Sequence, residues 1–237
     1  LAAAARAVAA VLSEGRSADD ALSFTERAAH RSAVRAVTLG ALRWCQRIEP
    51  AVLPLLARPG KDTQALLRTL LIVAVHQLEM SRNPRESTVS AAVDAARLLG
   101  EARAAGVINA VLRRFLRERE TLLAAVDADQ AQRTSHPAWL VEALRAAWPE
   151  DVDAILAANN QHPPLTLRVD LSRVSMGDYR EQLRAAGIES HSASWLPTAL
   201  TLQSPVPVSR LPGFAEGLVS VQDASAQLAA HLLAAHA

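Results

Sequence analysis

The sequence predicts a mainly α-helical protein that ends in a small α+β unit. Two observations support this fold class. Apolar residues recur with the helical period of about 3.6 residues through the first half of the chain. Short segments that alternate between apolar and polar residues occur only after residue 160. Half of the 237 residues are hydrophobic, so each of two parts can bury its own core. We expect these parts to cover residues 1–125 and 126–237.

One helix is expected to form the centre of the first part. Residues 66–80 are apolar on nearly every side, which is typical of a helix that is buried all round. Further helices are expected over residues 4–12, 31–48, 87–100 and 101–119. The first part is therefore predicted to be an all-α bundle.

Polar side chains mark the expected starts of three helices. Ser17 and Ser87 each precede a helical segment and can accept a hydrogen bond from its first turn. Ser175, with Asp178 three residues later, resembles a capping box.

The second part combines helices with short strands. Residues 124–136 are small and polar, and we expect them to form a linker. Strands are expected over residues 165–169, 199–203 and 218–221, and helices over 137–148, 149–159, 175–187 and 224–235.

The composition excludes several classes of protein and site. The single cysteine, Cys45, rules out a disulfide framework and a clustered-cysteine metal site. Cys45 lies within the apolar arc of its helix, which indicates a core residue. The seven histidines show no metal-ligand spacing, so no metal is expected. The longest apolar run, residues 70–75, is far shorter than the ~20 residues of a membrane span. We therefore expect a cytoplasmic protein without a membrane partner.

The charges divide unevenly along the chain. The formal net charge is only +1, but residues 1–130 carry 18 basic and 14 acidic side chains, whereas residues 131–237 carry 7 and 10. A mildly basic first part favours a nucleic-acid partner. An ordinary solvated surface explains the same charges equally well.

Four arginines form the most informative pattern. On a helix over residues 101–119, the apolar side chains fall on one side, among them Val107, Ile108 and Phe115. The opposite side carries Arg103, Arg113, Arg114 and Arg117. Guanidinium groups on one solvent-facing stripe can grip a phosphate backbone, although such a stripe can also simply keep a helix soluble.

A polar junction precedes the last helix. A strand ending near Val221 is followed by Gln222, Asp223 and Ser225. A helix start flanked by such groups can form the edge of a ligand site. An ordinary N-cap made by Asp223 or Ser225 fits the sequence equally well.

Several segments together resemble a known family. Residues 106–114, GVINAVLRR, resemble the last-helix signature of NusB-like RNA-binding domains, and residues 66–78 resemble the central helix of that domain. The segments 135–140, 158–169 and 221–227 follow in the order found in bacterial 16S ribosomal RNA cytosine-5 methyltransferases of the RsmB type.

This resemblance implies a NusB-like domain, a small α+β subdomain and then a Rossmann-like core that binds S-adenosylmethionine. In that family a cysteine of the core adds to the target cytosine, which makes the neighbouring carbon nucleophilic. The sequence is expected to stop before this core, because no glycine-rich cofactor loop or matching cysteine follows Ser225. We therefore assign no catalytic residue, and we expect the chain itself to be inactive and not to bind S-adenosylmethionine tightly.

The expected function is the RNA-binding region of an S-adenosylmethionine-dependent 16S ribosomal RNA methyltransferase, with 16S or precursor small-subunit ribosomal RNA as partner. The expected RNA contacts are Arg103, Arg113, Arg114, Arg117, Arg31, Arg35 and Arg168. Gln222, Asp223 and Ser225 are weaker candidates for residues near the cofactor. Two alternatives stay open: a non-enzymatic NusB-like antitermination module and a protein-interaction scaffold.

Overall fold

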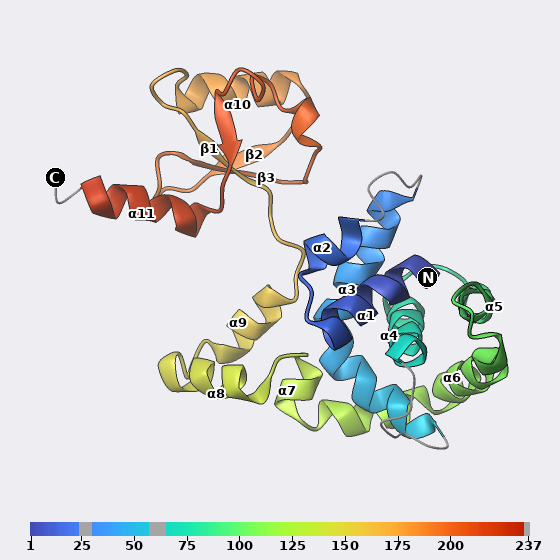
Figure 1. Cartoon of the computed structure of the whole chain (residues 1–237). Coiled ribbons are helices and arrows are strands. Elements are labelled where there is room, and N and C mark those ends of the chain that lie inside the picture. The colour runs from blue at the N-terminus through green and yellow to red at the C-terminus, as the bar shows by residue number, and fades with distance from the viewer. Residues whose placement is uncertain (24–29, 57–64, 235–237) are drawn as a thin grey trace. The chain divides into compact units, whose positions relative to one another are not determined.

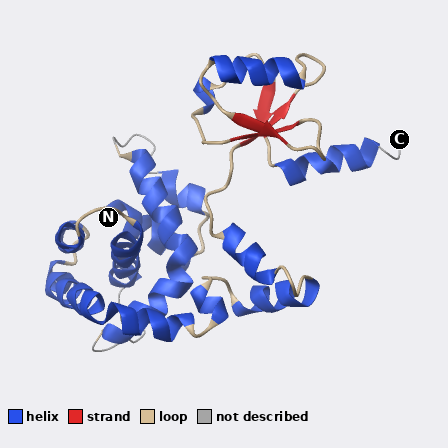
Figure 2. Cartoon of the chain, turned by 180° about the vertical axis from the view of Figure 1, so that it is seen from behind, coloured by secondary structure: helices blue, strands red, loops and turns tan. Residues whose placement is uncertain are grey.

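The protein forms two compact units. The computed structural model describes residues 1–23, 30–56 and 65–234. By its contacts the chain divides into Leu1–Asn160 and Gln161–Ala237 (Figure 1). In the described residues every strand belongs to the second unit (Figure 2). The predicted fold class, a helical bundle followed by a small α+β unit, is confirmed.

The first unit is entirely helical in the described residues. Its longer elements are α1 (Ala2–Glu14), α3 (Arg31–Val52), α4 (Ala65–Met80), α5 (Arg85–Leu98) and α6 (Ala105–Asp127). Shorter ones are α2 (Ala18–Leu22), η2 (Leu53–Leu55), η3 (Ala102–Ala104), α7 (Gln130–Arg133), α8 (Ala138–Ala147) and α9 (Val152–Asn159).

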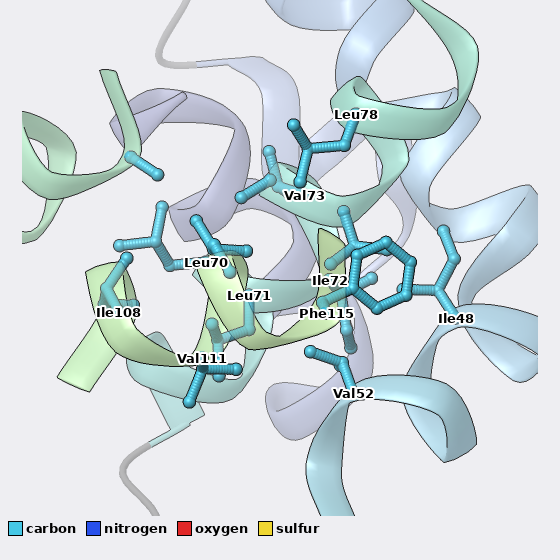
Figure 3. Packing of buried hydrophobic residues seen from close by; sticks show 14 of the residues in the cluster. Ile48, Val52, Leu70, Leu71, Ile72, Val73, Leu78, Ile108, Val111 and Phe115 are labelled. Carbon is cyan, nitrogen blue, oxygen red and sulfur yellow. The ribbon is translucent and has the colours of Figure 1, made fainter. Parts of the chain in front are cut away.

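Helix α4 is the centre of the bundle. It packs against α1, α3, α5 and α6, and every residue from Thr69 to His76 is buried. Its Leu70, Leu71 and Ile72 belong to the same core cluster as Ile108 and Phe115 of α6 (Figure 3). The one hydroxyl in this stretch is satisfied locally, because Thr69 Oγ1 donates to the Ala65 carbonyl at 2.9 Å. A helix without a polar face is thus stable here because neighbours cover all its sides.

Two bidentate ion pairs fix α6 to its neighbours. Arg47 of α3 donates to both carboxylate oxygens of Asp127 at 2.7 Å. Arg119 of α6 donates to both oxygens of Glu79 of α4, also at 2.7 Å. The Glu79 side chain is only 7% exposed, so this pair is less screened by solvent than a surface ion pair.

The predicted linker over residues 124–136 is wrong. Helix α6 continues to Asp127 because Leu123 and Val126 are buried in the main core. Helix α7 then packs against α3 and α6. A buried turn follows, in which the carbonyl oxygen of Thr134 lies 2.6 Å from His136 Nδ1 and accepts a hydrogen bond from Asn160 Nδ2 at 2.7 Å. The contact division therefore lies at residue 160, while the expected boundary between residues 125 and 126 stays a prediction.

The second unit is built on a four-stranded antiparallel sheet. Its elements are β1 (Thr166–Val169), α10 (Met176–Ala185), β2 (Ser190–Ser192), β3 (Ala199–Leu202), η4 (Val208–Arg210), β4 (Val219–Val221) and α11 (Ala224–Ala234). The strand order is β2-β3-β1-β4. Strand β2 was not predicted, because its three residues are polar and too few to show alternation.

The two faces of this sheet differ. Leu167, Val169 and Leu200 pack with Tyr179 and Leu183 of α10 in one core. The other face is only partly covered. There α11 lies against β1.

The buried amide of Gln227 anchors α11 to the sheet. Its Oε1 accepts a hydrogen bond from Thr198 Oγ1 at 2.8 Å, and its Nε2 donates to the Gln222 carbonyl at 3.1 Å. Both ends of this amide are therefore satisfied inside the unit.

Two of the three predicted caps are confirmed. Ser17 accepts from the Asp20 amide at 3.1 Å, and Ser175 accepts from the Asp178 amide at 3.1 Å. The cap predicted at Ser87 is wrong. Helix α5 already begins at Arg85, because Pro84 breaks the chain with an extended ψ of 137° and helical residues follow at once.

A glycine sets the closest approach of α3 to α4. A Cβ added to Gly40 would lie 2.5 Å from Nε2 of the buried His76 ring. We expect Gly40→Ala to destabilise the protein by about 1–3 kcal/mol through overpacking, measured by urea denaturation. Gly106→Ala is the matched control, since its Cβ would have no neighbour within 4 Å. Equal stability of the two variants would contradict the packing argument.

The same histidine makes stability depend on pH. Desolvation, helped by the charge of Arg43, lowers the pKa of His76 from 6.5 to about 4. Because the folded pKa lies below the unfolded one, the unfolded chain takes up the proton first. The contribution of the neutral His76 ring to the free energy of unfolding is complete above about pH 6.5. It falls by at most about 3 kcal/mol as the pH decreases towards 4. The difference in urea midpoint between the unmodified chain and His76→Gln should therefore shift in favour of the variant as pH falls across this window. A constant difference would refute this assignment.

Candidate nucleic-acid interface

Helix α6 separates an apolar face from a basic one. Ile108, Val111, Leu112 and Phe115 are buried. Arg113, Arg114 and Arg117 are exposed on the same helix, and Arg103 is exposed in the preceding η3 turn. We call these four residues the arginine stripe. Val107, which the helical period places on the apolar side, is 44% exposed, so the buried face is narrower than the apolar side of the sequence.

The four guanidinium groups differ in their partners. Arg114 Nε donates to Glu118 Oε1 at 2.9 Å, and this carboxylate raises the pKa of Arg114. Arg113 Nε donates to Asn109 Oδ1 at 3.0 Å, which leaves its two terminal nitrogens available. Within the described residues, Arg103 and Arg117 have no hydrogen-bond or ion-pair partner. The stripe therefore offers two unpaired cations and a third that keeps most of its donors.

A groove runs beside the stripe between α5 and α6. Its volume is about 420 Å³, and Arg97, Asp94, Glu86, Asn109 and Arg113 are among its lining residues. Arg97 donates to Asp94 at 2.7 Å. Gly106 keeps the groove open, because it presents no side chain there. Arg97 was not among the predicted contacts, since its nearness to Arg113 depends on how the two helices pack. With two arginines and two carboxylates, the groove favours mixed hydrogen bonding over simple anion binding.

The other predicted arginines lie elsewhere. Arg31 and Arg35 are exposed in the first turns of α3, and Arg35 forms an ion pair with Asp19 at 2.9 Å. Both partners of that pair are well exposed, so solvent weakens it. Arg168 lies on β1 of the second unit.

The junction before α11 is a helix cap in the structure. Asp223 Oδ1 accepts hydrogen bonds from the amides of Ser225 at 2.8 Å and Ala226 at 3.3 Å. The Gln222 carbonyl accepts from Gln227. The Asp223 carboxylate is used to cap α11, so these three residues alone do not form a binding site for S-adenosylmethionine. Their expected role near the cofactor stays a prediction.

The cysteine fits a packing role. Cys45 is partly buried against the main core. Burial, with a smaller effect of Glu49, raises the pKa of the Cys45 thiol, which makes it a poor nucleophile at neutral pH.

Neither a cluster for a metal ion nor a membrane-spanning helix occurs in the described part of the chain. It contains no group of three or more His, Cys, Asp or Glu side chains placed to hold a metal ion. It also contains no helix with the length and apolarity to span a membrane.

Two family models match successive parts of the chain. The NusB family model matches residues 2–117. The model described as Methyltr_RsmF/B-like, ferredoxin-like domain matches residues 136–209. The first region contains the arginine stripe, and the second contains Arg168 and strands β1, β2 and β3 of the sheet.

Curated relatives match nearly the whole chain. Proteins named ribosomal RNA small subunit methyltransferase B are 41% identical in Pseudomonas syringae pv. tomato and 42% identical in Pseudomonas putida, each over 98% of this chain. The relative of that name in Vibrio cholerae is 37% identical over 100% of it. The chain spans about half the length of these relatives, between 52% and 55%.

One solved structure shares the fold. The crystal structure of PH0851 matches with a TM-score of 0.60 at 16% identity, over 94% of this chain and 53% of that one. At this identity the match supports the fold alone.

The cap before α11 can be tested directly. We expect Asp223→Ala to lower the free energy of unfolding of the second unit by about 1 kcal/mol, because two amides of α11 lose their acceptor. Asp223→Asn keeps an acceptor oxygen and should stay close to the unmodified chain. Urea denaturation checks both, and an Asp223→Ala variant as stable as Asp223→Asn would remove the capping role.

Proposed function

Because the chain belongs to the family of ribosomal RNA small subunit methyltransferase B proteins, we propose that it is the region of such an enzyme that holds ribosomal RNA. The observation that carries this proposal is the pair of matched domains, NusB and then ferredoxin-like, in relatives about 40% identical over 98% of the chain. A stand-alone antitermination module needs no RsmF/B-like domain, so this order favours the methyltransferase.

The proposed reaction of the complete enzyme is methylation of carbon 5 of a cytosine in 16S ribosomal RNA, with S-adenosylmethionine as methyl donor. We assign none of its chemical steps to residues 1–237. The cofactor supplies the methyl group when it is bound elsewhere in the enzyme. The contribution of this chain is to bind and orient the RNA.

The arginine stripe is the proposed phosphate contact. Its guanidinium groups are exposed, and Arg103 and Arg117 are unpaired in the described structure, so binding RNA phosphates breaks no ion pair at these two positions. Planar guanidinium forks suit phosphate oxygens. Arg31 and Arg35 are proposed as secondary contacts, since Arg35 must first exchange Asp19 for a phosphate.

Paired substitutions test the stripe. We expect Arg103→Ala/Arg117→Ala to weaken binding to 16S ribosomal RNA fragments and to make its salt dependence shallower, by about 0.7–0.9 in slope per lost phosphate contact. Arg113→Ala/Arg114→Ala should act in the same direction but less strongly, because Glu118 already offsets Arg114. Fluorescence anisotropy over a salt titration measures both effects.

The matched control is Arg16→Ala. Arg16 is an exposed arginine of the same unit that pairs with Asp20 at 2.7 Å and lies outside the stripe. If both double variants kept the affinity and the slope of this control, the stripe would not be the RNA contact. Competition with an acidic polypeptide such as polyglutamate separates RNA binding from attraction to an acidic protein surface.

A further inference from the structure

A polar hollow lies in the second unit, which does not contain the arginine stripe. Its volume is about 550 Å³, within the range of about 300–1,000 Å³ typical of small-ligand sites. The hollow lies where β1 ends and β4 begins. Its walls are formed by residues 168–171, Thr198, Gly217, Val219 and Ser220.

Strand register creates this hollow. Arg168 on β1 is directly opposite Ser220 on β4 and Ala199 on β3. Directly opposite residues share one face of a sheet, so Arg168 and Ser220 lie on the face away from α10. Both are exposed, because α11 covers only part of that face.

Several polar groups of the hollow are already paired. The Val169 amide donates to the Thr198 carbonyl, and the Asp170 amide donates to the Leu218 carbonyl, both at 2.9 Å. Thr198 Oγ1 donates to Gln227. These three groups are not available to a ligand, whereas several side chains of the hollow still have free donors or acceptors.

Three such groups line the hollow. Arg168 has no hydrogen-bond or ion-pair partner among the described residues, and the same holds for Ser220 Oγ. In the turn after β1, only Oδ1 of Asp170 is used. It accepts hydrogen bonds from the Ser172 amide at 3.1 Å and from the Ser172 hydroxyl at 2.7 Å. These hydrogen bonds lower the pKa of Asp170, so the carboxylate is ionised at neutral pH and Oδ2 is a free acceptor.

Gly217 lines one end of the hollow without a side chain. Gly217 has a φ of +75°, and a Cβ there would lie 3.1 Å from Nη1 of Arg173. Arg173 itself is held by the Glu216 carbonyl. A larger residue at position 217 would be strained and would crowd this arginine.

The combination of groups selects the ligand. A lone guanidinium binds any anion, whereas the neighbouring Asp170 carboxylate accepts a hydrogen bond from a donor such as a hydroxyl, so a ligand that carries both an anion and a hydroxyl fits the two groups best. A ribonucleotide unit supplies both complementary groups, a phosphate and a 2′-hydroxyl, and the 2′-hydroxyl is what distinguishes RNA from DNA. An acidic peptide supplies the anion without the hydroxyl.

We infer that this hollow binds one ribonucleotide unit of single-stranded RNA, with Arg168 on the phosphate and Asp170 Oδ2 on the 2′-hydroxyl. Ser220 Oγ is placed to donate to the same phosphate. This inference rests on the proposed function and adds a second contact to it, one that discriminates between RNA and DNA.

Two variants test the two contacts separately. Arg168→Gln should weaken binding of a single-stranded RNA oligonucleotide about tenfold and lower the salt slope by about 0.7. Asp170→Asn keeps the Oδ1 acceptor of its turn but replaces the charged Oδ2 by a neutral amide, so the charge-assisted hydrogen bond from the 2′-hydroxyl is lost and the ratio of RNA to DNA affinity should fall by roughly three- to tenfold. The DNA oligonucleotide has the same bases, with deoxyuridine in place of uridine.

The control is Arg184→Ala on α10, the helix that covers the opposite face of the sheet. Arg184 is exposed and pairs with Glu181. Thermal melting of each variant shows that it is folded. Arg168→Gln and Asp170→Asn variants that melt normally and bind like the control would overturn this inference, while weakened binding by the stripe variants in the same assay would leave the proposed function standing. An unmodified chain that binds no RNA would overturn both.

Discussion

The burial of α4 on every side is the constraint from which the first unit follows. Residues 69–76 have no solvent face, so the folded chain must place a helix against each side of them. Helix α6 meets this demand with Ile108, Leu112 and Phe115. Once that face turns inwards, the helical period places Arg113, Arg114 and Arg117 outside. The basic surface is therefore a consequence of the core, because α6 cannot rotate about its axis without exposing Phe115.

The arginines of this unit then divide by what they face. Arg47 and Arg119 lie at helix contacts, and each grips a carboxylate with two hydrogen bonds. Removing Arg119 would leave the nearly buried carboxylate of Glu79 without a compensating charge. Arg103 and Arg117 face solvent and keep all their donors. In the sequence these four arginines look alike. Only the packing of α3, α4 and α6 shows that Arg47 and Arg119 form ion pairs between helices, whereas Arg103 and Arg117 are left for a ligand.

The sequence predicted the parts of the fold that depend on local patterns. Periodicity found α4 and the two faces of α6, and short polar signals found the caps at Ser17 and Ser175. It did not reveal that residues 124–136 are largely helical, because the reason is the burial of Leu123 and Val126 against helices far away in the chain. The pairing of Arg47 with Asp127 spans 80 positions and leaves no local trace. The hollow beside Arg168 was missed for the same reason, since Ser220 reaches it only through strand register.

The open sheet face also limits how this unit can read RNA. Domains that recognise bases on a four-stranded sheet stack them on aromatic rings carried by the strands. Here the register places Thr166, Arg168, Ala199, Thr201, Ser220 and His191 at the positions facing away from α10. Among these residues the imidazole of His191 is the one ring, and none is Phe, Tyr or Trp. Where these hydroxyls and the guanidinium contact sugar and phosphate, as proposed for the hollow beside Arg168, the contacts fix register and orientation without carrying sequence information. Under the proposed function, the choice of target nucleotide therefore depends on the shape of the RNA and on the part of the enzyme that performs the chemistry, whereas this chain sets how the strand lies.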